Sequence, residues 1–263
     1  MVYSISTIPV LQDNYVYAIT CSYTGDTAII DCGECGPVLD YMDNDVGLYN
    51  SSVSNDGLGV KSLMTVLLTH HHSDHVHGVA ELKMRLSERD DMHVCDVVGN
   101  ANDIARLKDV TTAVVDGDIF EILGGLSVHV LGVDGHTVGD LAYYIPDLST
   151  IFTGDCLFTM GCGRMFEGDY ETYFSSMQKI KKLPIDTRIY GGHEYTASNI
   201  KFAQSLGGIS DEGLAYIEEL KTLSAHSVPT VPSFLENELY YNPFLRVKTA
   251  KEFKNIRIQK DNF

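Results

Sequence analysis

Apolar residues in the first two thirds of the chain fall in short runs that predict strands. Residues 15–20 and 27–31 are two such runs, and the turn-forming segment 22–26 between them predicts a hairpin. Residues 41–60 are polar and glycine-rich, which predicts a surface loop. Further strands are expected at 63–69, 93–98, 119–123, 126–133, 141–145, 150–153 and 187–190.

Helical spacing appears between these strands and dominates from residue 194 onward. Val76, Val79, Leu82 and Leu86 recur at intervals that predict a helix over 76–88. The other expected helices are 170–182, 196–206, 211–225 with Ser210 as its N-cap, and 249–259. Strands with helices between them favour an α/β fold in which helices cover mixed sheets, and a helical region follows it.

The composition is that of a globular protein with a sizeable core, because 44% of the 263 residues are apolar and 21% are charged. The net charge of −17 argues against nucleic acid as a partner, since it would repel phosphate. No apolar run reaches the ~18 residues that span a bilayer, and no signal peptide is visible. The six cysteines form no dense framework, so we expect reduced thiols and a cytoplasmic protein without membrane association.

Candidate chemistry is concentrated directly after the expected strand 63–69. His70, His71, His72 and His75 stand with Asp74 in six consecutive positions. Imidazole and carboxylate groups are the ligands that divalent transition ions prefer. A solvated loop is the alternative for a histidine run. This run is internal and follows a strand at once, so we favour a metal site.

Three more segments share one form, in which a strand-like run leads to a small residue and then to a metal-type side chain. They end at His136, Asp155 and His193, each preceded by glycine. Side chains at strand ends are held by a rigid sheet and lie where α/β sheets place ligands. Each segment alone is weak evidence, since a lone histidine is more often a satisfied polar residue. Together with the cluster they predict one metal site, and the remaining histidines are expected to be structural or surface residues: His71, His77, His93, His129 and His226.

Two further features are open to more than one interpretation. Asp31 ends the apolar run 28–30 and could accept a hydrogen bond from a ligand histidine or simply form a turn. The last eighteen residues are basic, which could form an anion-binding patch or a solvated helix face. The cations of this patch are Arg246, Lys248, Lys251, Lys254, Arg257 and Lys260.

The pattern His-x-His-x-Asp-His at 70–75 is similar to the signature of the metallo-β-lactamase superfamily. Within it, longer segments closely resemble the glyoxalase II (hydroxyacylglutathione hydrolase) family over almost the whole chain. They are Leu11-Gln12-Asp13-Asn14-Tyr15, Thr153-Gly154-Asp155-Cys156-Leu157-Phe158, Gly161-Cys162-Gly163-Arg164, Gly192-His193-Glu194-Tyr195-Thr196 and Asn242-Pro243-Phe244-Leu245-Arg246.

The resemblance implies a four-layer αβ/βα sandwich over 1–193 and a smaller helical, substrate-binding domain over 194–263. It implies two divalent ions per chain, with Zn first and Fe or Mn as alternatives. One ion would be held by His70, His72 and His136, the other by Asp74, His75 and His193, and Asp155 would bridge both. The implied glutathione contacts are Arg164, Phe166, Tyr195, Arg257 and Lys260.

The implied activity is hydrolysis of S-D-lactoylglutathione to glutathione and D-lactate, in methylglyoxal detoxification, by a monomer. Two metals would activate a water and polarise the thioester carbonyl, with Asp74 orienting that water, so no serine or cysteine nucleophile is needed. Some relatives carry tyrosine at the position of Phe166, and the segment 43–60 is longer than the family pattern by about a dozen residues.

Three alternatives remain at this stage. A glutathione persulfide dioxygenase shares the fold but resembles a one-iron site with three protein ligands. Another hydrolase of the metallo-β-lactamase fold is the second, although a nuclease is disfavoured by the charge of −17. The third is a metal-binding interaction protein without catalysis. It is disfavoured because all seven ligand positions are filled and two of them are aspartates, whereas structural zinc sites are closed four-coordinate shells.

Overall fold

The computed structural model describes residues 1–46, 62–89 and 92–263. The chain divides into two compact units, an N-terminal unit, Met1–Val128, and a C-terminal unit, His129–Phe263. The domain boundary expected after residue 193 stays a prediction. Most of the expected loop 41–60 lies outside the described residues, but its first residues are helical, because α1 (Cys35–Tyr41) continues into a π-helical turn (Met42–Val46).

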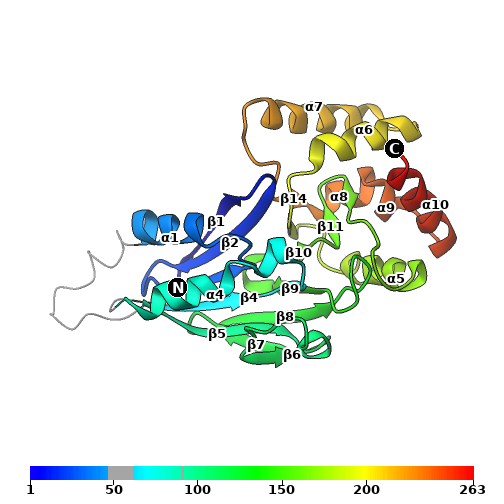
Figure 1. Ribbon diagram of the computed structural model, residues 1–263. Coiled ribbons are helices and arrows are strands. Elements are labelled where there is room, and N and C mark those ends of the chain that lie inside the picture. The colour runs from blue at the N-terminus through cyan, green and yellow to red at the C-terminus, as the bar shows by residue number, and fades with distance from the viewer. Residues whose placement is uncertain (47–61, 90–91) are drawn as a thin grey trace. The chain divides into compact units, whose positions relative to one another are not determined.

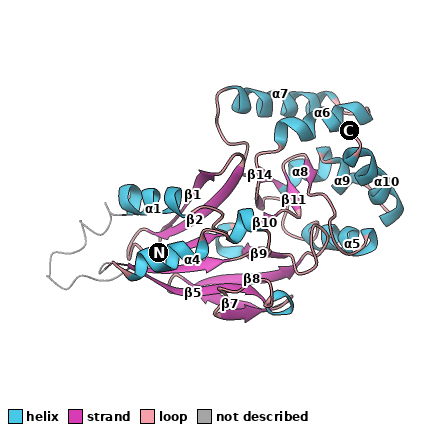
Figure 2. Ribbon diagram, viewed as in Figure 1, coloured by secondary structure: helices cyan, strands magenta, loops and turns pink. Residues whose placement is uncertain are grey.

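The N-terminal unit is built on a six-stranded sheet with the order β1-β2-β3-β4-β5-β6 (Figures 1 and 2). The first three strands are antiparallel neighbours and the last four are parallel. Their bounds are β1 (Tyr3–Val10), β2 (Asn14–Cys21), β3 (Thr27–Ile30), β4 (Ser62–Leu67), β5 (Met92–Asn100) and β6 (Thr112–Val114). The predicted hairpin is therefore confirmed, and β1 is an additional strand.

Helices α1 and α4 (Val79–Ser87) cover this sheet through apolar side chains. Val38 of α1 and Leu82 of α4 are fully buried, in one cluster with Ile29 of β3 and Val66 of β4. The single helix expected over 76–88 is in fact two, α3 (Ser73–Val76) and α4, separated at His77 and Gly78. A side chain at Gly78 could not fit, because its Cβ would lie 2.8 Å from the backbone nitrogen of Cys35.

The second sheet has the order β14-β13-β10-β9-β8-β7. The boundary between the units falls within its strand β8. Strands β10 and β13 are parallel, and the other pairs with a defined register are antiparallel. The bounds are β7 (Ile119–Ile122), β8 (Leu126–Gly132), β9 (Leu141–Ile145), β10 (Thr150–Gly154), β13 (Arg188–Gly191) and β14 (Ser233–Phe234), and a small ribbon adds β11 (Leu157–Phe158) and β12 (Gly161–Cys162).

The helices of the C-terminal unit are α5 (Tyr170–Ile180), α6 (Thr196–Leu206), α7 (Asp211–Ala225), α8 (Leu235–Tyr241), α9 (Pro243–Arg246) and α10 (Ala250–Asp261). Figure 1 shows α5 beside α10, where the rings of Tyr173 and Phe253 meet edge to face with centroids 5.0 Å apart. Short 3₁₀ turns stand at Ala101–Asp103 and Pro146–Leu148. Among the described residues, no helix is both long enough and apolar enough to cross a membrane.

Candidate metal centre

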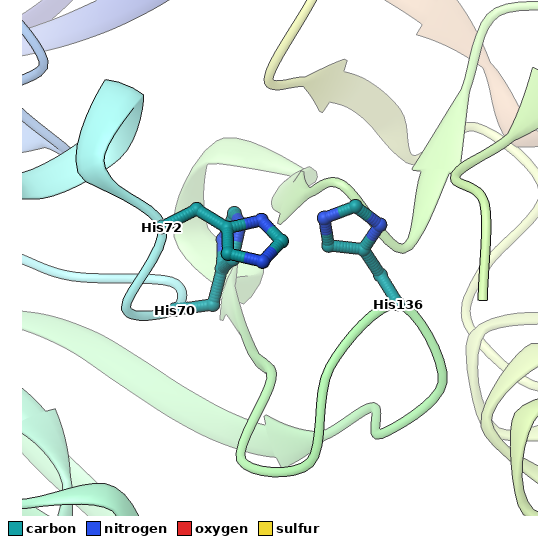
Figure 3. A group of neighbouring side chains, drawn as sticks. All are labelled: His70, His72 and His136. Atoms are coloured by element: carbon teal, nitrogen blue, oxygen red, sulfur yellow. The ribbon is translucent and has the colours of Figure 1, made fainter. Parts of the chain in front are cut away.

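The histidine cluster of the N-terminal unit follows β4 directly. His70 and His75 are buried, and the ring centroid of His70 lies 4.7 Å from that of His72 and 4.2 Å from that of His75. Figure 3 shows His70 and His72 on the segment that leads from β4 into α3, and His136 on the loop that follows β8. His70 offers a ring nitrogen within 4.8 Å of one from His72 and of one from His75. The cluster therefore gathers its imidazoles rather than spreading them into solvent.

Asp31 anchors this cluster from the end of the neighbouring strand. Its backbone nitrogen bonds to the carbonyl of Leu67, because β3 and β4 are parallel and end together. Its carboxylate accepts from Thr69 N (2.8 Å), Thr69 Oγ1 (2.8 Å) and His75 Nδ1 (2.8 Å). A carboxylate at Nδ1 fixes the proton there and leaves the Nε2 lone pair for another partner. The interpretation of Asp31 as a histidine acceptor is confirmed.

Asn14 orients the acidic member of the cluster. It is buried at the start of β2, and its Nδ2 donates to Asp74 Oδ2 at 2.8 Å. Asp74 Oδ2 lies 3.5 Å from His75 Nε2, and the Asp74 side chain is 38% exposed. Asp74 therefore presents a fixed oxygen beside an imidazole while it stays accessible to a small molecule. The sequence signal was a polar residue at the first position of an otherwise apolar strand.

His71 bonds to residues outside the cluster, as expected for a structural residue. Its Nδ1 lies 3.0 Å from Asp103 Oδ2, and its Nε2 lies 3.2 Å from Arg106 Nη1. Both ring nitrogens are thus engaged by groups that are not proposed ligands. The ring of His71 lies 6.3 Å from that of His70 and 4.9 Å from that of His72, so it stays beside the cluster while its nitrogens bond elsewhere.

The C-terminal unit brings together its three predicted ligands. Asp155 follows β10 and His193 follows β13, and the parallel pairing of these strands aligns Gly154 with Gly191. Asp155 Oδ2 lies 3.3 Å from His136 Nε2 and 3.3 Å from His193 Nε2. All three side chains are at least nine-tenths buried. One carboxylate oxygen is therefore shared between two imidazoles.

The chemistry of these donors fits a cation. His136 Nδ1 lies 2.8 Å from the carbonyl oxygen of Arg164, which can only accept, so Nδ1 carries the proton. When the ring is neutral, Nε2 has a lone pair that faces the carboxylate oxygen of Asp155. Two electron-rich atoms 3.3 Å apart are stabilised by a positive charge that both can reach, and a divalent ion meets that need.

The loop that carries His136 is shaped by Asp140. Its carboxylate accepts from Thr137 N at 2.7 Å and from the Thr137 hydroxyl, and its carbonyl accepts from Val133 N. Burial raises the pKa of Asp140 to about 8. The segment 133–140 is thereby closed on itself, with His136 at its tip.

Comparison with known proteins assigns the chain to a family. Residues 11–193 match the model of the metallo-beta-lactamase superfamily, and residues 194–263 match that of the hydroxyacylglutathione hydrolase C-terminus. The hydroxyacylglutathione hydrolase of Cereibacter sphaeroides is 38% identical over 98% of this chain and 98% of its own length. The chain belongs to the glyoxalase II (hydroxyacylglutathione hydrolase) family. The resemblance expected from the motifs is confirmed.

Solved structures agree on the fold of this glyoxalase II family member. ETHE1 from Myxococcus xanthus matches with a TM-score of 0.64 and 24% identity, and the match covers 98% of this chain and 90% of that one. A protein crystallised in a di-iron-bound form matches with a TM-score of 0.51 and 25% identity, over 72% of this chain and 91% of that one. The chain has the metallo-β-lactamase fold followed by a helical C-terminal region, and its histidine and aspartate groups indicate divalent metal binding.

Two of the predicted substrate residues lie directly against predicted ligands. The ring of Tyr195 stacks on His193, with centroids 4.6 Å apart and planes within 7°. The ring of Phe166 meets His136 edge to face at 5.2 Å. Tyr195 is 37% exposed and Phe166 is 60% exposed. Both rings are thus partly exposed aromatic surfaces beside predicted ligands of the C-terminal unit, and their role in substrate binding stays a prediction.

The three predicted cations of the substrate site have different surroundings. Arg164 is 54% exposed, with Nε 3.3 Å from Asp261 Oδ1. Lys260 Nζ donates to Ser198 Oγ at 2.9 Å and to its carbonyl. Arg257 is only 3% exposed, and its guanidinium bonds to the carbonyl of Cys162 and to Asp261. Substrate binding by Arg257 stays a prediction, and its burial indicates a structural role as well.

Proposed function

We propose that this protein hydrolyses S-(2-hydroxyacyl)glutathione thioesters, S-D-lactoylglutathione foremost, to glutathione and a 2-hydroxy acid such as D-lactate. The observation that carries the proposal is the match along the whole chain, which includes a C-terminal region typical of hydroxyacylglutathione hydrolases. The superfamily motif alone is common to many hydrolases, whereas this region is the part associated with the substrate. The activity belongs to methylglyoxal detoxification, and we assign it to a cytoplasmic monomer.

The proposed metal ligands form two sets. His70, His72 and His136 would hold one divalent ion, and Asp74, His75 and His193 would hold the other. Asp155 would be shared by both ions, and this assignment is supported by its Oδ2, which lies 3.3 Å from His136 Nε2 and 3.3 Å from His193 Nε2. Zinc is the first candidate, and iron or manganese also suit this mixture of nitrogen and oxygen ligands. The relative crystallised with two irons supports a count of two.

Divalent ions bound here would lower the pKa of a bound water toward ~7 and polarise the thioester carbonyl. The residues of the chain do the positioning. Asn14 holds the carboxylate of Asp74, which can accept a hydrogen bond from the attacking water and fix its direction. Asp31 and the carbonyl of Arg164 hold the rings of His75 and His136.

Substrate recognition is proposed to combine packing on two aromatic rings with attraction by three cationic side chains. Tyr195 and Phe166 pack against the acyl and cysteinyl parts, and Arg164, Arg257 and Lys260 attract the glutathione carboxylates. A local positive region on a chain of net charge −17 would concentrate the anionic substrate at one place. Because Phe166 has no hydroxyl, this position contributes contact area rather than a hydrogen bond.

The test is a thioester assay with metal analysis of the same sample. We expect hydrolysis of S-lactoylglutathione well above that of thioesters of coenzyme A or of simple thiols, and two equivalents of metal per chain. Oxygen uptake with glutathione persulfide, without thioester hydrolysis, would replace the proposal by a dioxygenase. Bound metal with neither activity would favour an interaction protein.

A further inference from the structure

Tyr173 lies beneath the ligands of the C-terminal unit without being one of them. It is on α5, it is fully buried, and burial raises the pKa of its phenol, so the hydroxyl keeps its proton. The hydroxyl lies 2.8 Å from the carbonyl oxygen of Cys156, 3.1 Å from that of Gly163 and 3.5 Å from that of Asp155. One donor therefore serves carbonyls of two segments, one after β10 and one after β12.

These two segments set the positions of Asp155 and His136. The backbone nitrogen of Gly163 donates to the carbonyl of Asp155 at 3.1 Å, and the next carbonyl, that of Arg164, faces His136 Nδ1 at 2.8 Å. A Cβ at Gly163 would lie 2.1 Å from the Asp155 carbonyl oxygen and 2.9 Å from His136 Nδ1. The segments are thus in direct contact with the ligands, and a small shift of one moves the other.

The ring of Tyr173 supports His136 from a second direction. A Cβ at Gly135, the residue before His136, would lie 2.1 Å from Cγ of Tyr173, so the backbone there rests on the ring. The ring is held in turn by Phe253, and Arg257 Nη1 bonds to the carbonyls of Cys162 and Gly163. Tyr173 therefore contacts backbone next to two of the three ligands, at Gly135 before His136 and at the carbonyls of Asp155 and Cys156.

We propose that Tyr173 is a positioning residue that fixes Asp155 and His136 in the geometry required for metal binding. This inference rests on the proposed function for its choice of metal and substrate. The alternative is a core tyrosine whose hydroxyl contributes only to folding. Removal of the hydroxyl oxygen alone distinguishes the two roles. Loss of a group that orients metal ligands lowers metal affinity or turnover, typically by about 10- to 100-fold, whereas loss of a group that contributes only to folding lowers stability alone.

The test compares Tyr173→Phe with Tyr143→Phe, the removal of a hydroxyl from another fully buried tyrosine of the same unit, on β9. Zinc affinity of each metal-free protein is measured by competition with a chromophoric chelator, beside the midpoint of thermal unfolding. We expect Tyr173→Phe to weaken zinc binding by about tenfold or more. In the zinc-loaded enzyme, kcat should fall while KM for S-lactoylglutathione stays near that of the parent. Tyr143→Phe should lower the midpoint comparably and leave zinc affinity unchanged.

Equal zinc affinity in Tyr173→Phe and the parent, or an equal loss in both variants, would overturn the positioning role. If Tyr173→Phe does not fold, Phe253→Leu replaces it, because it removes the ring that packs on Tyr173 and leaves the ligands themselves unchanged; unchanged zinc affinity there has the same meaning. A parent that binds zinc but hydrolyses no glutathione thioester removes only the proposed function, since the affinity comparison still decides the role of Tyr173. A parent that binds none of zinc, iron and manganese would overturn both.

Discussion

The candidate ligands of the two units are chemically similar, but different kinds of contact hold them in place. In the N-terminal unit the candidate ligands are neighbours in sequence, and side chains from distant positions, Asp31 and Asn14, orient them. In the C-terminal unit the ligands come from three separate segments, and backbone carbonyls and a buried phenol orient them. A contiguous motif thus needs remote side chains for its geometry, whereas a dispersed set relies on the backbone of the sheet that assembles it.

The largest effect is expected where one atom serves two ligands. Asp155→Ala should abolish metal pairing and turnover, because both His136 and His193 lose the shared oxygen. Metal content by elemental analysis should fall below two ions per chain, and thioester hydrolysis should fall to background. Asp186→Ala removes an equal charge from an exposed position of the same unit and should change neither. Full activity with two bound ions in Asp155→Ala would end the bridging assignment.

The second prediction concerns Asp31, which lies far in sequence from the ligand cluster at 70–75 that it orients. Asp31→Asn keeps the backbone, because asparagine tolerates the positive φ of 60° found there. It removes the charge that faces His75 Nδ1, so we expect metal affinity or kcat to fall by about 10- to 100-fold. Asp103→Asn makes the same change opposite His71, which is not a proposed ligand, and should leave metal affinity unchanged. Equal affinities in both variants would remove the distinction between the two histidines.

A smaller effect is expected from the cationic end of the C-terminal unit. Arg257→Ala should raise KM for S-lactoylglutathione about tenfold, the loss expected for one or two charge-assisted hydrogen bonds shared by ground and transition states. Because Arg257 is buried and bonded to backbone, its midpoint of thermal unfolding should also fall. Lys251→Ala, at an exposed position of α10, controls for the charge. A KM equal to that of the parent would leave Arg257 with a purely structural role.

The smallest effect is one of stability and concerns the backbone scaffold. Glu238 Oε2 accepts from the nitrogen of Met160 in the turn between β11 and β12, and burial raises the pKa of Glu238 from 4.5 to about 7. The folded state therefore holds a proton that the unfolded state releases, so the free energy of unfolding decreases as pH rises between these values. The contribution of this carboxyl to the slope is about 1 kcal/mol per pH unit, and Glu238→Gln should remove that contribution.

Urea unfolding of parent and variant across this pH range is the measurement. Glu236→Gln, at an exposed position of the same helix, should keep the slope of the parent. Parallel pH profiles for Glu238→Gln and the parent would show that this carboxyl titrates alike in both states.

Local patterns predicted the elements that have strong local signals. Helices α6 and α7 have the expected bounds, and the Ser210 side chain accepts from Gly213 N as an N-cap should. Strand β1 was missed because it is only partly buried, and α8 and α9 were missed because they are short and lie among prolines. The break between α3 and α4 depends on the close approach of Gly78 to Cys35, which no periodicity encodes.

For the candidate site, too, sequence patterns identified some residues and not others. The cluster at 70–75 was visible because its residues are adjacent, and Asp31 was found because it ends a strand. Asn14 and Tyr173 were not recognised as orienting groups, since their partners lie 60 and 10–18 positions away and become neighbours only in the fold. What the sequence lacks is the pairing of strands, which decides which polar side chains meet.

Strand β4 has a consequence for engineering. It begins at Ser62 and leads to the histidine cluster after Leu67, so its two ends are about 17 Å apart at the rise of an extended strand. Changes made in the first residues of β4 enter at the end remote from the cluster. A fluorophore attached through a cysteine substituted for the exposed Leu63 should therefore leave catalysis intact, which makes the start of this strand a convenient attachment point for labelling or immobilising the protein.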